Sequence, residues 1–246
     1  MRTVHNVQPH EPGRALENRL LERADRAVDL YIKLNTTTEI PRPKKSVTIL
    51  HGHYKDRTTF QVDTRRRRGT ILYFGLIREY KGVPGLINAF RDLCDEDARL
   101  KIVGKPASEE MGSQVSELAG ADDRISTQLS FVADKQLARE ISGAELVVLP
   151  YREMHNSGSL LLALSLGTPV LVPESTSNEE IRKEVGGDWI LTYSGTLTKN
   201  HLSNALQSVR SVGRTAEPDL AARDWDNVKE KHYLAYIAAR GKRQAF

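Results

Sequence analysis

The chain has 246 residues, a formal net charge of +4, 39% hydrophobic residues and 28% charged residues. These values describe a globular protein that can bury a sizeable core. The single cysteine, Cys94, excludes an intrachain disulfide framework and a cysteine-based zinc site. Residues 1–15 lack the apolar core of a signal peptide, and no apolar run is long enough to span a membrane. We therefore expect a cytoplasmic protein.

The first 69 residues contain few predicted elements. Apolar spacing predicts a strand that starts at Val4, a helix over 13–27, and strands over 28–34 and 47–50. This set is too small for a complete α/β domain, so residues 1–69 are predicted to be the latter part of one, followed by a linker. His51 and His53 flank a glycine with no carboxylate at ligand spacing, so we expect no metal site there.

A run of four arginines, Arg65 to Arg68, precedes the next predicted strand. A run of like charges is most often a solvated loop. The alternative is contact with anionic lipid headgroups or another polyanion, which would place the protein peripherally at a membrane. No aromatic residues are interleaved with the arginines, so we expect no nucleic-acid binding.

From residue 70 to about 215, apolar strands alternate regularly with amphipathic helices. The strands are predicted over 71–74, 100–103, 125–131, 146–149, 170–172 and 189–193. The helices are predicted over 83–94, 108–119, 134–142, 157–166, 178–185 and 197–211, with N-caps at Ser108 and Ser177. This alternation predicts a doubly wound, Rossmann-like parallel sheet with ligands at the carboxyl ends of its strands.

The loop after the first of these strands has the composition of a phosphate site. Gly75 lets the backbone approach a ligand, and Arg78 and Lys81 would neutralise its charge. The simpler interpretation is a pair of surface cations. A second loop, Asn156-Ser157-Gly158-Ser159, opens a helix whose free N–H groups favour an anion, although Asn156 or Ser157 would also serve as an ordinary N-cap.

The chain resembles the retaining glycosyltransferases of the GT-B class, in the sucrose-synthase-like family (family 4). The stretches that carry the resemblance are Phe74–Val83, Leu86–Phe90, Leu100–Gly104, Val147–Tyr151, Asn156–Ser159 and Ala163–Val172, with Thr3–Glu11 and Leu50–Tyr54 upstream. The resemblance implies a partial N-terminal acceptor-side domain over 1–69 and a nucleotide-sugar domain over 70–215. It also implies that residues 216–246 form a helix crossing back to the first domain.

By this resemblance the protein transfers a sugar from a nucleotide-diphosphate sugar to a hydroxyl of a glycan, glycolipid or small molecule. The configuration would be retained, and neither metal nor other cofactor would be needed. Gly75, Arg78 and Lys81 would hold the diphosphate with the 156–159 loop, although Leu76 stands where the family carries an arginine. The loops that contain Gly104, Lys105 and Val132 would contact the nucleotide.

Two further residues are candidates at the transferred sugar. His5 resembles the family's histidine in the acceptor domain, and a neutral imidazole could assist proton movement. The family also carries two glutamates eight positions apart, which fall on Met154 and Leu162 here. Glu153, one residue out of register, is the candidate for the first of them. The second has no counterpart.

The length of the chain leaves other interpretations open. Two complete domains of this kind need roughly 300 residues or more, so a partner or a second copy of the chain would complete the first domain, or the chain is a fragment. The alternative function is a non-catalytic nucleotide-sugar-binding or assembly protein, and a sugar-phosphate epimerase is a third. The C-terminal segment predicts an amphipathic helix that uses Trp225, Val228, Tyr233, Tyr236 and Ile237, which a partner-binding helix would share.

Overall fold

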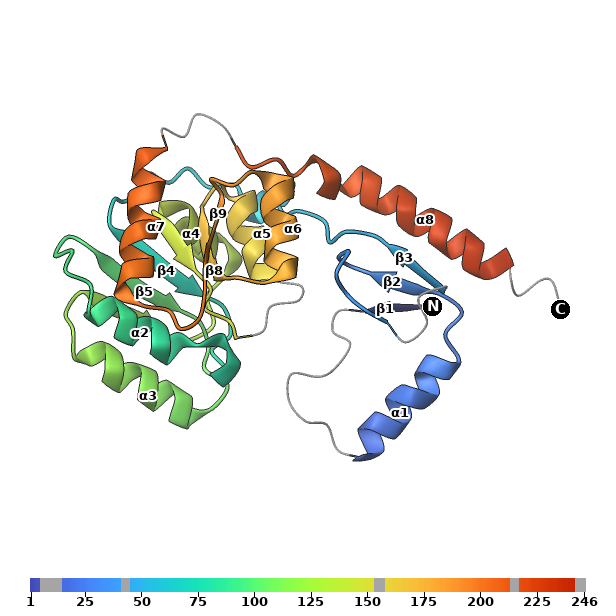
Figure 1. The fold of residues 1–246 in the computed structure, drawn as a ribbon, viewed down its shortest axis with the longest axis horizontal. Coiled ribbons are helices and arrows are strands. Elements are labelled where there is room, and N and C mark those ends of the chain that lie inside the picture. The colour runs from blue at the N-terminus through green and yellow to red at the C-terminus, as the bar shows by residue number, and fades with distance from the viewer. Residues whose placement is uncertain (5–14, 41–44, 153–157, 213–216, 242–246) are drawn as a thin grey trace. The chain divides into compact units, whose positions relative to one another are not determined.

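The computed structural model describes residues 1–4, 15–40, 45–152, 158–212 and 217–241. The chain divides into two compact units, both drawn in Figure 1. Unit 1 comprises Met1–Gly52 and Ala221–Phe246, and unit 2 comprises His53–Leu220. These boundaries differ from the predicted 69/70 and 215/216. Phe60 and Leu220 account for the difference, because both are buried in the core of unit 2.

Unit 2 contains the predicted parallel sheet. Its strands are β4 (Thr70–Phe74), β5 (Arg99–Val103), β6 (Ile125–Gln128), β7 (Leu146–Val148), β8 (Val170–Pro173) and β9 (Ile190–Tyr193). All neighbours are parallel, in the order β6-β5-β4-β7-β8-β9. Strand order therefore reverses between β4 and β7, which makes this pair the topological switch point of the sheet.

Helices cover both faces of this sheet, which confirms the doubly wound prediction. They are α2 (Val83–Arg91), α3 (Glu109–Gly120), α4 (Asp134–Gly143), α5 (Gly158–Ser165), α6 (Thr176–Val185) and α7 (Lys199–Ser211), with short 3-10 helices η2 (Thr58–Phe60) and η3 (Glu79–Lys81). Helix α2 packs against α3 and α7 on one face, and α4, α5 and α6 cover the other (Figure 1). Strand β4 is buried along its whole length, as an inner strand of such a sheet must be.

Two predicted element ends are corrected by local hydrogen bonds. Strand β6 ends at Gln128 and does not reach Phe131, because Gln128 is the last residue paired with β5 and Phe131 is 81% exposed. Helix α6 begins earlier than predicted and is capped by Ser175, whose hydroxyl accepts from the Asn178 N–H. The predicted Ser108 cap is confirmed, since its hydroxyl accepts from the Met111 N–H.

Unit 1 contains a small three-stranded parallel sheet. Strands β1 (Arg2–Val4), β2 (Tyr31–Lys33) and β3 (Ser46–Thr48) pair in that order, and the unit also holds helix α1 (Ala15–Arg26). After the 3-10 helix η4 (Ala221–Arg223), helix α8 (Trp225–Gly241) packs on this sheet. Among the described residues, no helix is both long and apolar enough to cross a membrane.

The predicted apolar face of α8 is corrected by this packing. Val228 and Ala235 are buried against Ile32, Leu34 and Ile49. The other predicted positions are exposed: Trp225, Tyr233, Tyr236 and Ile237. The sequence locates the helix but not the side that faces the sheet, because aromatic and aliphatic residues occur around much of its circumference.

Candidate functional site

The loops that follow β4 and β5 lie side by side at the carboxyl edge of the sheet. The Ile77 N–H donates to the Lys105 carbonyl, and the Ala107 N–H donates to the Ile77 carbonyl, both at 2.9 Å. A Cβ atom on Gly104 would lie 1.8 Å from the Gly75 carbonyl oxygen, so the two backbones can meet only because residue 104 is glycine. The predicted residues Gly75, Gly104 and Lys105 therefore belong to one continuous edge.

Lys81 lies at the switch point, where the loop after β4 meets the loop after β7. Its ammonium donates to the Tyr151 hydroxyl at 3.2 Å and lies 4.4 Å from the centroid of the Tyr151 ring. A Cβ atom on Gly75 would lie 3.8 Å from the Lys81 Nζ and 3.5 Å from the Ser159 Oγ. The bare backbone of Gly75 thus faces both polar groups.

Two cations share this small space. Burial, and secondarily the charge of Arg78, lower the pKa of Lys81 from 10.5 to about 8. No carboxylate of the described residues lies within ion-pair distance of the Lys81 ammonium. An anion placed between the two cations would relieve their repulsion and replace the lost hydration of Lys81. We call Gly75, Arg78, Lys81 and Tyr151 the clamp.

Tyr151 was not among the predicted site residues. Burial raises its pKa far above the usual value, so its phenol is neutral and can both accept from Lys81 and donate to a ligand. The rings of Tyr73 and Tyr80 pack edge-on against it, with centroids 6.5 and 6.4 Å away. The one sequence signal was its position, directly after Pro150 at the end of a buried strand.

The remaining predicted residues are placed as follows. Ser159, in the first turn of α5, hydrogen-bonds with Tyr151, and Gly158 is the first residue of that helix. Lys105 is exposed, whereas the side chain of Val132 belongs to the hydrophobic core. Phe131, beside Val132, is exposed. It was not considered as a site residue because it was predicted to be the last residue of a strand. His5, Glu153, Asn156 and Ser157 lie outside the described residues.

The arginine run at the opposite end of β4 is engaged by the protein itself. The Arg66 guanidinium donates to the Gly167 carbonyl at 2.5 Å, and the Arg67 guanidinium donates to the Glu140 carboxylate at 3.2 Å. Lys101 also pairs with Glu140, at 2.7 Å. At least two of the four arginines thus have structural contacts.

A doubly wound parallel sheet holds its ligand at the carboxyl ends of its strands, and the switch point of this α/β protein carries a desolvated lysine and a second cation. Residues 68–209 match the family model described as Glycosyl transferases group 1. The match covers more than half of the chain, and the chain belongs to this family. The protein is a glycosyltransferase that uses a nucleotide-sugar donor and a hydroxyl acceptor.

Named relatives agree with this assignment. Two curated proteins of Xanthomonas campestris pv. campestris, both named GDP-mannose:glycolipid 4-beta-D-mannosyltransferase, are 46% identical over 242 residues. Each alignment covers 98% of this chain and 69% of the relative.

Solved structures share the GT-B fold at low sequence identity. Anabaena HepE, solved with UDP and glucose, aligns with a TM-score of 0.70 at 16% identity, over 96% of this chain and 71% of HepE. WaaG, a glycosyltransferase involved in lipopolysaccharide biosynthesis, aligns with a TM-score of 0.60 at 17% identity, over 96% of this chain and 73% of WaaG.

Proposed function

We propose that this glycosyltransferase transfers mannose from GDP-mannose to a hydroxyl group of a glycolipid. The observation that carries the proposal is the 46% identity, over 98% of this chain, to relatives named for that donor and acceptor. The clamp supplies the matching chemistry, because a nucleoside diphosphate is the leaving group of every such donor.

In this proposal the clamp stabilises the leaving diphosphate. As the bond between mannose and the diphosphate breaks, negative charge develops on the phosphate oxygens. Lys81 and Arg78 stand ready to neutralise it without reorganisation. The Tyr151 hydroxyl and the Ser157–Ser159 backbone amides would add hydrogen bonds. Because the two cations supply the positive charge that neutralises the phosphate oxygens, no metal is required, and activity should persist in excess EDTA.

The guanine base would lie over the loops that follow β5 and β6. Gly104 and Lys105 supply one side, and Phe131, 81% exposed, supplies an aromatic surface for stacking. Val132 would contribute through its backbone, since its side chain is buried. Stacking of a base on an aromatic ring contributes about 1–3 kcal/mol. The Phe131→Ala variant should weaken GDP binding accordingly and leave the thermal stability of the free protein unchanged.

His5 and Glu153 remain proposals for the sugar-proximal residues. In His5→Ala and Glu153→Gln we expect kcat to fall while GDP affinity stays within about twofold of the parent protein, because neither residue is assigned to the diphosphate. A loss of GDP affinity in either variant would contradict this division of roles.

Retention of configuration is a further proposal, from the resemblance to the sucrose-synthase-like family. The names of the relatives point the other way, because they specify a β-linked product. A β-mannoside made from an α-linked mannosyl donor is formed with inversion. The one-bond C–H coupling of the product's anomeric carbon distinguishes retention from inversion. An α-mannoside would support retention, and a β-mannoside would show inversion instead.

The donor and acceptor are tested by transfer of radiolabelled sugar into the organic-soluble fraction. Purified protein is supplied with a glycolipid extract and, separately, GDP-mannose, UDP-glucose, UDP-galactose or ADP-glucose. We expect label from GDP-mannose alone. Label from another donor would overturn the choice of GDP-mannose, and label in water-soluble products only would overturn the glycolipid.

We also propose peripheral contact with anionic membrane, in keeping with a lipid-linked acceptor. All four arginines of the run are exposed, and Arg65 and Arg68 are the two that are not engaged by the contacts described above. Flotation with phosphatidylglycerol vesicles should recover the parent protein and less of an Arg65→Glu/Arg68→Glu variant. Equal recovery of both would remove the arginine run from the proposal. Size-exclusion chromatography with light scattering tests the further proposal of a homo-oligomer.

A further inference from the structure

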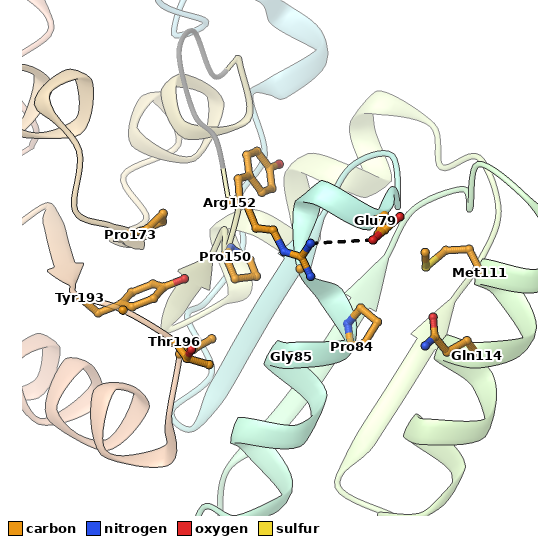
Figure 2. Close-up of a pocket in the computed structure, with 14 residues that line it drawn as sticks. Glu79, Pro84, Gly85, Met111, Gln114, Pro150, Arg152, Pro173, Tyr193 and Thr196 are labelled. Carbon is orange, nitrogen blue, oxygen red and sulfur yellow. Dashed lines mark ion pairs between the residues drawn. The ribbon is translucent and has the colours of Figure 1, made fainter. Parts of the chain in front are cut away.

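Beside the clamp, unit 2 contains a cavity of about 710 Å³ (Figure 2). It is formed by the starts of α2 and α3 and by the loops that follow β7, β8 and β9. Of the described residues that we assign to the donor, Tyr151 alone lines it. Its volume falls within the range of about 300–1,000 Å³ that is typical of small-ligand sites.

The walls of the cavity include several apolar and aromatic side chains. Figure 2 shows Tyr193 and Pro173 on one side and Met111 on the other, with Pro84 between them on α2. Burial raises the pKa of Tyr193 to about 12, so its phenol is uncharged. The Tyr193 ring lies 5.3 Å from the imidazole of His201 at an interplanar angle of 30°, which fixes its orientation.

Three planar polar groups are added to these walls. Gln114 projects from α3, and Glu79 and Arg152 form an ion pair with 3.8 Å between charged atoms (Figure 2). The Glu79 and Arg152 side chains are 84% and 71% exposed, so both can still turn toward a ligand. Together the amide, carboxylate and guanidinium offer both donors and acceptors to a ligand.

This combination fits a sugar ring better than the other ligands at hand. A pyranose presents C–H faces that pack on proline, methionine and aromatic side chains, and hydroxyl edges that bond to amides, carboxylates and guanidinium groups. A second phosphate is disfavoured, because the one cation among the lining residues that the structure describes, Arg152, already faces Glu79. A lipid tail is disfavoured, because it would desolvate Glu79, Arg152 and Gln114 without bonding to them.

The cavity also lies next to the clamp. Tyr151 belongs to the clamp through its hydroxyl and lines the cavity as well, so the two sites share one residue. We infer that this cavity binds a sugar residue of the glycan acceptor. The inference rests on the proposed function, since it needs a glycan acceptor and a donor held by the clamp.

Direct binding of simple disaccharides tests the inference and does not require the natural acceptor. The chain has three methionines, so ¹³C-methyl-methionine NMR gives few signals, and Met111 is assigned with a Met111→Leu variant. The probes are cellobiose, maltose and a mannobiose. We expect at least one of them to shift the Met111 methyl signal in a saturable way.

Matched variants connect the shift to the lining groups. Gln114→Ala and Arg152→Ala should each weaken binding of the active disaccharide about tenfold through loss of a hydrogen bond. Gln207→Ala, an exposed glutamine on α7 outside the cavity, should leave it unchanged. A Met111 signal unmoved by all three disaccharides, or equal affinity in all variants, would overturn the inference.

The proposed function is followed in the same samples by the stabilisation that GDP confers against heat. Stabilisation by GDP without a disaccharide shift would reject the glycan subsite alone. Absence of GDP stabilisation would reject the donor assignment, whatever the disaccharides do.

Discussion

Two basic clusters flank the same strand, β4, and they differ in what surrounds them. The arginine run before β4 is tied to a backbone carbonyl by Arg66 and to the carboxylate of Glu140 by Arg67. The clamp after β4 holds Lys81 against a neutral phenol and beside a second cation, with its pKa lowered. Arg66 and Arg67 of the first cluster thus already have partners in the protein, whereas Lys81 of the second gains from a bound anion. Charge composition alone would not separate them, because the arginine run is the denser of the two.

Removing one cation from each cluster tests most directly whether the two clusters differ in function. Lys81→Ala should lower kcat/KM about 10²–10³-fold, the usual effect of losing one group that stabilises transition-state charge. Arg67→Ala should leave kcat/KM within about twofold, because that side chain is satisfied by Glu140 at the other end of the strand. Initial rates of mannosyl transfer measure both. Equal losses in the two variants would show that the clusters do not differ in function.

A second substitution tests the backbone that shapes the clamp. Gly82 has φ +68°, and a Cβ atom there would lie 2.4 Å from the Pro150 carbonyl oxygen. Gly82→Ala should therefore reduce the free energy of unfolding by about 1–3 kcal/mol.

Gly85 is the matched control for that substitution, because its Cβ position is empty within 4 Å and it lies inside α2. Gly85→Ala should raise stability by about 0.5–1 kcal/mol. Urea denaturation measures both variants. A stable Gly82→Ala variant would mean that the loops after β4 and β7 are not held together as described.

The pH dependence of GDP binding tests the role of Lys81 in the clamp. Since the pKa of Lys81 is about 8 in the free protein, a bound diphosphate should raise it by favouring the charged form. GDP affinity should be greatest below pH ~8 and fall about tenfold per pH unit above it. Without ligand the sign reverses: unfolding restores the ordinary pKa of 10.5, so the contribution of Lys81 to stability rises with pH between about 8 and 10.5. Calorimetric titrations across this range check the first trend, and a flat profile would contradict it.

The smallest effect is expected from Arg67→Ala on stability. The Arg67 side chain is 51% exposed and shares Glu140 with Lys101, so the loss should be about 0–1 kcal/mol. Thermal unfolding in low and high salt provides the measurement. A loss well above this range would mean that the arginine run is a core element of the fold.

The alternation of elements could be predicted because its cause is local. Buried strands such as β4 and β7 are apolar throughout, and the spacing of apolar residues marks the helices between them. The loop with Gly75 and Lys81 was found for the same reason, since its residues are contiguous. The six-stranded sheet followed from these patterns, whereas the GT-B class came from the resemblance of the motifs to a known family.

What escaped prediction depends on contacts between distant residues. Tyr151 reaches Lys81 across 70 positions, and Arg67 reaches Glu140 across 73. Nothing in either neighbourhood specifies the partner. The buried side of α8 was missed because small Ala235, rather than the larger Tyr236, faces the sheet. Such choices are made by packing and not by propensity.

The central claim is that the clamp after β4 binds the diphosphate, and calorimetric titration with GDP tests it most directly. The parent protein, Lys81→Ala and Arg67→Ala are titrated at pH ~7, where Lys81 is charged in the free protein. We predict that Lys81→Ala weakens GDP binding about 10- to 100-fold, the value of one charge-assisted hydrogen bond, while Arg67→Ala binds as the parent does. Affinity in Lys81→Ala within about twofold of the parent would contradict the account.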